Sequence, residues 1–124
     1  MSVSFDQAVL DALRAEEEVE IETSAGEDGP SHRTVIWVVV DGEGRVLIRS
    51  YRGAGARWFR EIMARPETRL HVRAQALAVR AVPATDADRV AACSEELGRK
   101  YAGHHSVRSM VTKYVETTLE LIPR

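Results

Sequence analysis

The residues best suited to chemistry lie between positions 31 and 60. Between Gly44 and Arg60 the chain has five arginines and no carboxylate, and a guanidinium is a planar donor fork that suits phosphate. The small-residue loop 52–56 lets backbone N–H groups approach an anion, and the helix expected after it adds a positive dipole end. Nearby aromatic residues and strand edges could hold a flat ring. Together these parts predict a site for a planar ring with a phosphorylated tail.

Each of these parts also has a structural interpretation. Arginines on a strand often form only a solvated face, and Trp37 and Trp58 are also typical of core anchors. Residues 1–43 carry eleven carboxylates and two arginines, whereas residues 44–82 carry nine arginines and two glutamates. A positive patch of this kind attracts anions. Alternatively, the acidic and basic surfaces face each other within the fold or across a dimer.

Other chemically capable residues give weaker signals. His104 and His105 are adjacent, so their side chains point apart, and no cysteine or acidic partner lies at metal-ligand spacing. A solvated loop is the simpler interpretation, although the loop carrying His105, Arg108 and Lys113 could close over a partner subunit's ligand. Cys93 lies in an apolar helical stripe and is expected in the core. We therefore expect no metal site and assign no catalytic residue.

The elements that position these residues follow from hydrophobic periodicity and turn signals. Ser4 and Gln7 form a capping-box pattern that predicts a helix with Ser4 as its N-cap, and Thr85 is expected to cap a later helix. Helices are predicted at 5–16, 56–64 and 85–101, with a helical turn at 106–112. Strands are predicted at 18–24, 33–40, 45–51, 68–73, 76–82 and 114–121.

Six short strands with hairpin links predict a small antiparallel β-barrel with short flanking helices, in the α+β class. The run 33–40 is almost entirely β-branched or aromatic, which is typical of a strand covered on both faces. The length of 124 residues predicts a single domain over 1–124. No apolar run is long enough for a membrane span, and the first residues do not resemble a secretory signal. The single cysteine is consistent with a reducing cytoplasm.

The sequence also resembles a known family over about residues 18–122. The stretches Arg33–Gly42, Val46–Gly53 and Ala56–Phe59 are similar in type and spacing to the flavin-binding split β-barrel group. This group includes pyridoxamine 5′-phosphate oxidases and deazaflavin-dependent nitroreductases, and the chain looks like an uncharacterised bacterial branch of it. The resemblance implies a split barrel that works as a homodimer and binds FMN or the deazaflavin coenzyme F420 at the dimer interface.

The resemblance also implies a role for individual residues. The cofactor phosphate would be held by residues at the end of the third strand and in the loop after it, namely Arg49, Ser50, Tyr51, Arg52 and Gly53. Arg57 and Trp58 would flank the phosphate. Residues 33–37 would border the ring, with Arg33, Val35 and Trp37 as the site residues. The loop lacks the proline, lysine and asparagine of the deazaflavin enzymes, and the C-terminal substrate segment of the oxidases is absent, so the choice between FMN and F420 stays open.

Three functions compete at this point. The first is an oxidoreductase in which the cofactor supplies the chemistry and reduces a small organic substrate. The second is a non-enzymatic protein that binds or senses a flavin-like or other anionic ligand. The third is nucleic-acid binding, which is disfavoured because few aromatic residues are interleaved with the arginines and the acidic first third would repel a polyanion. We expect a cytoplasmic protein with no nucleic-acid or membrane partner.

Overall fold

A computed structural model describes residues 4–124 of the chain. Residues 1–3, which entered the expectation that no secretory signal is present, lie outside this range. The described part contains four α-helices, two short 3₁₀ helices and seven strands. In chain order they are α1 (Gln7–Ala15), β1 (Val19–Ser24), β2 (Ser31–Ile36), β3 (Val39–Val40), β4 (Val46–Ile48), η1 (Gly53–Gly55), α2 (Arg57–Ala64), β5 (Glu67–Val72), β6 (Gln75–Pro83), α3 (Ala87–Lys100), α4 (Val107–Thr112), η2 (Val115–Thr117) and β7 (Leu119–Pro123).

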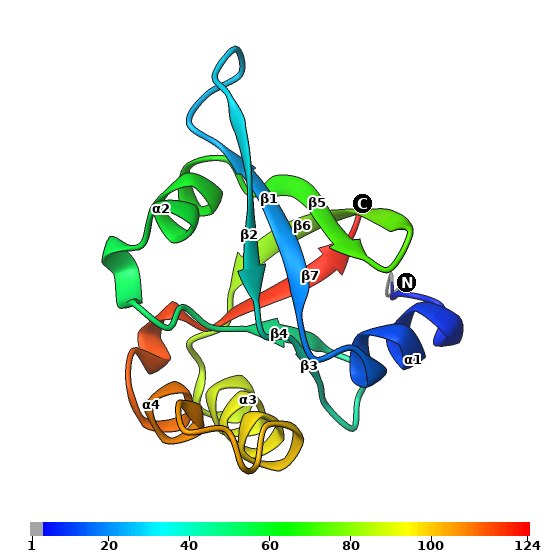
Figure 1. The fold of residues 1–124 in the computed structure, drawn as a ribbon, viewed down its shortest axis with the longest axis vertical. Coiled ribbons are helices and arrows are strands. Elements are labelled where there is room, and N and C mark those ends of the chain that lie inside the picture. Colours follow the sequence, from blue (N-terminus) through cyan, green and yellow to red (C-terminus); the bar gives the residue numbers. More distant parts are fainter. Residues whose placement is uncertain (1–3) are drawn as a thin grey trace.

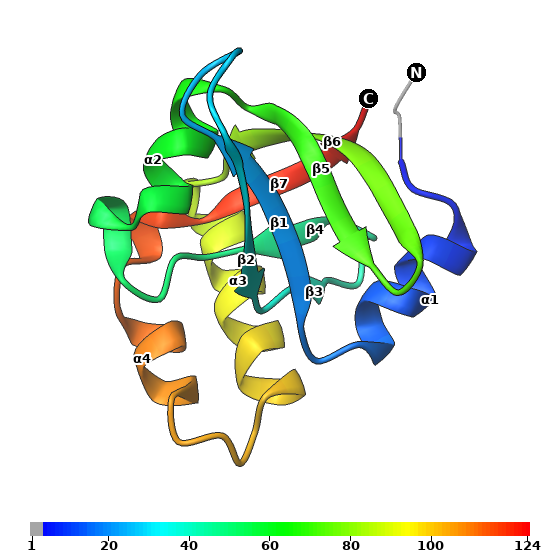
Figure 2. The ribbon, with the colours of Figure 1, turned by 45° about the horizontal axis from the view of Figure 1, so that its top comes forward.

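The strands form one antiparallel sheet in the order β2-β1-β5-β6-β7-β4-β3. β2 and β3 follow each other in the chain but lie at opposite ends of this order, so the sheet curls until its two edges meet (Figure 1; Figure 2). The predicted α+β split-barrel class is confirmed. The structure has seven strands rather than six because the run 33–40 breaks after Ile36.

The break between β2 and β3 has a clear physical cause at the end of α3. The hydroxyl of Tyr101 accepts a hydrogen bond from the N–H of Val38 at 3.2 Å and donates to the carbonyl of Glu17 at 2.6 Å. The Lys100 ammonium donates to the carbonyls of Val38 and Leu13 at 2.7 and 2.8 Å. Since both backbone groups of Val38 bond to side chains of α3, Val38 lies outside the strand ladder.

Two apolar clusters stabilise the fold. One fills the barrel interior, and the other lies between the outer face of β3 and β4 and the helices α3 and α4. β4 serves both, because Val46 and Ile48 point into the barrel while Leu47 packs against α3 and α4. The expectation that both faces of 33–40 are covered is confirmed for Val38–Val40. It is wrong for β2, where Val35 remains 53% exposed, because the apolar cluster that covers the outer face of β3 and β4 includes no residue of β2.

Three predicted boundaries are corrected by the structure. Asp6 rather than Ser4 is the N-cap of α1, since the Asp6 carboxylate accepts from the N–H of Val9 at 3.0 Å. Asp86 rather than Thr85 is the N-cap of α3, since the Asp86 carboxylate accepts from the N–H of Arg89 at 3.0 Å. Tyr114 begins no strand: its φ of 55° lies in the left-handed region, and η2 separates it from β7. None of the helices within residues 4–124 has the length and apolar character that crossing a bilayer requires.

Candidate functional site

Two adjoining hollows lie where β2 meets the segment from β4 to α2. The first, which we call the Arg52–Arg57 groove, has a volume of about 700 Å³. The second, the Trp37–Trp58 cavity, has a volume of about 230 Å³. The groove is lined by Thr34, Val35, Tyr51, Arg52, Gly55, Ala56, Arg57 and Trp58. The cavity is lined by Glu18, Val35, Ile36, Trp37, Arg49, Tyr51, Trp58, Ser106 and Met110.

The two hollows share a wall made of Val35, Tyr51 and Trp58. Val35 and Tyr51 are each 53% exposed, whereas Trp58 is only 7% exposed and also belongs to the barrel core. Trp58 is therefore both a residue of the barrel core and part of the wall of the two hollows. The structure brings seven of the predicted site residues to these hollows: Val35, Trp37, Arg49, Tyr51, Arg52, Arg57 and Trp58.

The Arg52–Arg57 groove is positioned by a tight turn and a helix start. η1 leads into α2, whose N-cap Ala56 makes no side-chain capping hydrogen bond, and the first turn of α2 holds no acidic residue. The first N–H groups of a helix have no intrahelical partner and carry a partial positive charge. Within residues 4–124, neither Arg52 nor Arg57 forms an ion pair. The groove therefore has a positive potential.

The carboxylate of α2 itself bonds to the strands β1 and β2 and does not line the groove. Glu61, one turn after Arg57, accepts from the hydroxyl of Thr23 at 2.8 Å and lies 3.3 Å from Nδ1 of His32. Burial disfavours the ionised form of Glu61, but the bonds from Thr23 and His32 outweigh it and lower the pKa of this carboxyl. Glu61 thus links α2 to β1 and β2; the charge of Arg57 also helps to lower the pKa of Glu61, but the two residues form no ion pair.

Ser50 and Gly53 build the turn, and their polar groups are used within it. The Ser50 hydroxyl donates to the carbonyl of Gly53 at 2.7 Å, and the Ser50 N–H donates to Thr117 at 3.0 Å. Gly53 has a φ of +79°, and a Cβ atom there would lie 2.8 Å from the ring of Tyr114. Glycine is therefore needed at this position for backbone conformation and close packing. This arrangement differs from the expected one, in which both residues contact the phosphate.

Arg49 also has a different environment from the expected one. Its side chain is buried, with 1% of the residue exposed. The guanidinium donates to Thr118 and Ser94 at 3.0 Å and to the carbonyls of three residues of α3 and α4, namely Val90, Met110 and Val111, at 2.8 to 3.3 Å. Burial lowers the pKa of Arg49. Arg49 therefore ties α3 and α4 to β4, and the exposed cations of the groove are Arg52 and Arg57.

Arg33 is the predicted site residue that lies farthest from the expected arrangement. Its guanidinium pairs with Glu20 at 2.7 Å across the β1–β2 pair, where Glu20 faces Val35 and so lies diagonally to Arg33. Arg33 lines neither hollow.

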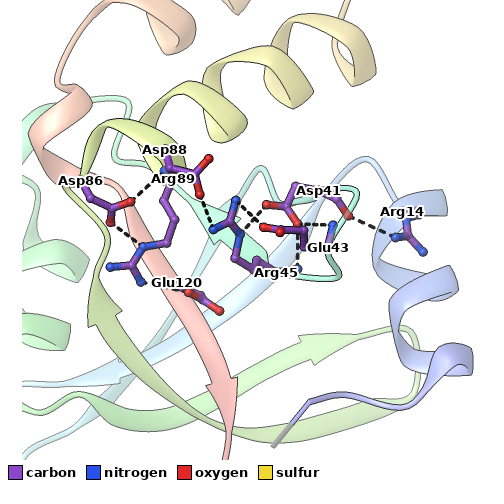
Figure 3. A network of polar contacts seen from close by, with 8 residues as sticks. All are labelled: Arg14, Asp41, Glu43, Arg45, Asp86, Asp88, Arg89 and Glu120. Atoms are coloured by element: carbon purple, nitrogen blue, oxygen red, sulfur yellow. Dashed lines mark hydrogen bonds and ion pairs between the residues drawn. The ribbon is translucent and has the colours of Figure 1, made fainter. Parts of the chain in front are cut away.

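The acidic first third of the chain does neutralise part of the basic stretch. Arg45 contacts Asp41, Glu43 and Asp88 at 2.6 to 3.1 Å, and beside this group Arg89 pairs with Asp86 and Glu120 (Figure 3). Asp88 and Asp41 raise the pKa of Arg45. Arg69 and Arg73 also meet first-third carboxylates, Glu22 and Glu16. Pairing within the fold is therefore confirmed for part of the basic stretch, while Arg52 and Arg57 form no ion pair among the described residues.

The aromatic wall of the cavity is held in place by residues that directly follow α3. Trp37 stacks on Tyr101 with ring centroids 3.9 Å apart and an interplanar angle of 3°, and His104 packs edge-on against both rings. Burial raises the pKa of the Tyr101 hydroxyl to about 12, so this hydroxyl stays protonated and keeps its bond to Glu17. Trp37 therefore presents a fixed surface.

Sequence reasoning missed several lining residues. Thr34 and Ile36 fall within the run 33–37 expected to border the ring, although Arg33, Val35 and Trp37 are the residues singled out. Glu18, Ser106 and Met110 come from distant segments, and no local pattern marks them. Cys93 is buried in the second apolar cluster, as predicted. Within residues 4–124, no three histidine, cysteine or acidic side chains are grouped so that they could hold a metal ion.

Comparison with solved structures places this fold among split-barrel proteins. The heme storage protein HutZ from Vibrio cholerae matches with a TM-score of 0.69 at 12% identity, over 98% of this chain and 91% of that chain. A pyridoxamine 5′-phosphate oxidase-like protein from Listeria innocua matches with a TM-score of 0.62 at 14% identity, over 94% and 91%. An F420 reductase matches with a TM-score of 0.57 at 17% identity, over 91% and 90%. At these identities the likeness shows the fold alone.

Comparison at the level of sequence gives the family. No curated protein matches the chain. The model of one family of uncharacterized proteins conserved in bacteria matches residues 9–121, which is most of the chain. The protein therefore belongs to the DUF2255 family and has a split-barrel fold.

Proposed function

We propose that this protein is an oxidoreductase that binds FMN or coenzyme F420 and reduces a small organic substrate. The observation that carries the proposal is the Arg52–Arg57 groove: two arginines without a carboxylate partner flank an uncapped helix start beside an aromatic wall. The phosphorylated tail would lie at Arg52, Arg57 and the first N–H groups of α2. In this proposal Arg52 and Arg57, which line the groove, have the phosphate-binding role that was expected for Arg49 and Ser50.

The ring would lie on the shared wall of Val35, Tyr51 and Trp58. β2 is the edge strand of the sheet, and an edge strand presents unpaired backbone N–H and C=O groups. Thr34 and Val35 of this strand line the groove. The backbone groups of β2 would thus form hydrogen bonds with one edge of a flat heterocycle, and Tyr51 and Trp58 would pack against its faces. The donors and aromatic surfaces present fit a flavin or deazaflavin.

The roles of the cofactor and of the protein follow from the residues at the site. When bound, the cofactor ring supplies hydride transfer, and the protein supplies binding, orientation and exclusion of water. Arg52 and Arg57 would fix the tail, and the wall would fix the plane of the ring. The structural relatives named above include a protein called an F420 reductase and one resembling pyridoxamine 5′-phosphate oxidase, which supports the same class of ligand.

A second copy of the chain would complete the site. Val35, Tyr51 and Tyr114 are large apolar residues that are 43 to 53% exposed, and the first two line the open groove. Exposed apolar surface of this kind is typical of an interaction site, so we propose a homodimer in which the partner covers the groove. Sedimentation as a monomer at micromolar concentration would argue against this arrangement.

The test is a comparison of FMN, F420 and riboflavin, which lacks the phosphate, by calorimetric titration. Either phosphorylated cofactor should bind more tightly than riboflavin. In a double variant, Arg52→Ser with Arg57→Ser, that advantage should fall by about 2 to 4 kcal/mol, the scale of two solvent-facing charge-assisted hydrogen bonds. Arg60→Ser is the matched control, since Arg60 lies on the same helix but lines neither hollow. An equal effect of the control and the double variant would reject the phosphate site.

The alternative is a protein that binds such a ligand without catalysis. Glu18 is the one carboxylate among the residues lining the two hollows, so acid–base groups are scarce there. Reduction of the bound cofactor followed by addition of candidate acceptors separates the two functions. Reoxidation only at the rate of the free cofactor would favour the binding or sensing function.

A further inference from the structure

We propose that the Trp37–Trp58 cavity binds a small planar aromatic compound with an anionic or hydrogen-bond-accepting end and a cationic end. Its assignment as the substrate of the reaction rests on the function proposed above. The binding chemistry itself comes from the cavity: aromatic walls, a buried cation at the floor and a free carboxylate at the rim.

The shape of the cavity fits one ring. Its volume is about 230 Å³, and pockets for drug-sized ligands begin at roughly 300 Å³. Trp37 is fixed by its stack on Tyr101, and Trp58 is nearly buried, so both indoles are preorganised. Because the cavity shares Val35, Tyr51 and Trp58 with the groove, its occupant would lie against the same wall as a ring bound in the groove.

The floor of the cavity carries a positive charge that forms no ion pair within residues 4–124, and the nearby carboxylate of Glu116 offsets only part of the effect of burial on its pKa. Arg49 lines the cavity but is 1% exposed, and no carboxylate within residues 4–124 pairs with it. All its described partners are neutral oxygens. Nη2 donates only to the carbonyl of Val90, and each terminal guanidinium nitrogen carries two N–H groups, so one donor is left over. A buried charge favours an opposite charge or an acceptor nearby.

The rim of the cavity carries a negative charge that is equally unpaired. Glu18 lies in the connection between α1 and β1, is exposed, and forms no ion pair within residues 4–124. Among the described residues that line the cavity, Glu18 and Arg49 are the two charged ones, and they come from segments that are far apart in the chain. A cation beside Glu18 would also meet the indole faces, which attract cations.

Three probes of matched shape test the proposal. Para-aminomethylbenzoate carries both charges at opposite ends of one ring, benzylamine carries only the cation, and benzoate carries only the anion. Trp37 and Trp58 are the only tryptophans of the chain, and both line the cavity, so quenching of intrinsic fluorescence reports binding there. The dipolar probe should bind about tenfold more tightly than either single-charge probe, as expected for one charge-assisted contact.

Two variants assign the charges. Glu18→Gln should reduce the affinity for para-aminomethylbenzoate to that for benzoate and leave benzoate binding unchanged. Glu27→Gln, at an exposed position in the turn between β1 and β2 that lines neither hollow, should change nothing. Equal affinities for the three probes, or loss of benzoate binding in Glu18→Gln, would overturn the proposal, as would the absence of quenching by all three.

A parallel titration with FMN or F420 separates this inference from the proposed function. Cofactor and dipolar probe binding together to one protein would support the cavity as the substrate side of the site. Displacement of the probe by the cofactor would overturn that assignment, because the cavity would then belong to the cofactor. If the probe binds in the predicted charge pattern while no cofactor binds, the ligand class of the cavity stands and the oxidoreductase proposal fails.

Discussion

Replacing Arg49 by methionine tests whether this residue stabilises the fold or binds the phosphate of the cofactor. The structure gives this guanidinium five neutral acceptors, three of them backbone carbonyls of Val90, Met110 and Val111. Methionine keeps much of the volume but removes all five of these hydrogen bonds, at about 1 to 3 kcal/mol for each buried acceptor left without another donor; the carbonyl of Val111 keeps the bond from the Ser94 hydroxyl at 3.2 Å. Removing a buried charge offsets part of this loss because its desolvation is avoided.

We therefore expect Arg49→Met to lower the free energy of unfolding by about 3 kcal/mol, or Tm by about 10 °C. Urea unfolding followed by circular dichroism measures the change. Arg52→Met is the matched control, since Arg52 is exposed and unpaired within residues 4–124, and it should stay within about 0.5 kcal/mol of the wild type. If Arg49→Met were as stable as the control but lost phosphate-dependent cofactor binding, Arg49 would bind the cofactor phosphate instead of stabilising the fold, and this reasoning would be refuted.

Three further predictions concern the frame of the site. Gly53→Ala should destabilise the protein by about 2 kcal/mol, since its φ of +79° disfavours a side chain and the new methyl group meets Tyr114; an unchanged urea midpoint would contradict this. Tyr101→Phe should cost about 1 to 2 kcal/mol, because the N–H of Val38 and the carbonyl of Glu17 lose their partner; a loss below about 0.3 kcal/mol would contradict it. Burial raises the pKa of Cys93 to about 11, so the unfolded thiol ionises first, near pH 9. The stability of the wild type relative to Cys93→Ala should thus be constant below pH 9 and fall toward pH 11; a rising difference would be inconsistent with a buried neutral thiol.

The fold could be predicted largely from local patterns. Alternation and turn signals located the strands, and the hairpin links excluded a parallel sheet. The break at Val38 could not be predicted from the strand itself, because its cause is the pair Lys100 and Tyr101 of α3, more than sixty residues later in the chain. Propensity alone favours a continuous strand through the run 33–40, and a tertiary contact overrides that preference.

The location of the candidate site could be predicted from the sequence, but the environment of each arginine could not. Arginines were grouped by their spacing in the sequence, which does not show whether a guanidinium faces solvent, a carboxylate or a buried carbonyl. Arg33 meets Glu20 across a strand pair and Arg49 meets α3 and α4, and both contacts join distant segments. Arg52 and Arg57 remained free because the turn and helix start that carry them project from the sheet. Glu18, Ser106 and Met110 reach the cavity only through the closure of the barrel.

The central claim is that a planar ring with a phosphorylated tail binds between β2 and the start of α2. Backbone amide resonances recorded during titration with FMN or F420 test it most directly. The account predicts shifts at Thr34, Val35, Gly55, Arg57 and Trp58, which line the groove, and none at Gly42 or Glu96, which line a separate hollow beside α1. Shifts confined to that second hollow, or no shifts at saturating concentrations of both cofactors, would contradict it.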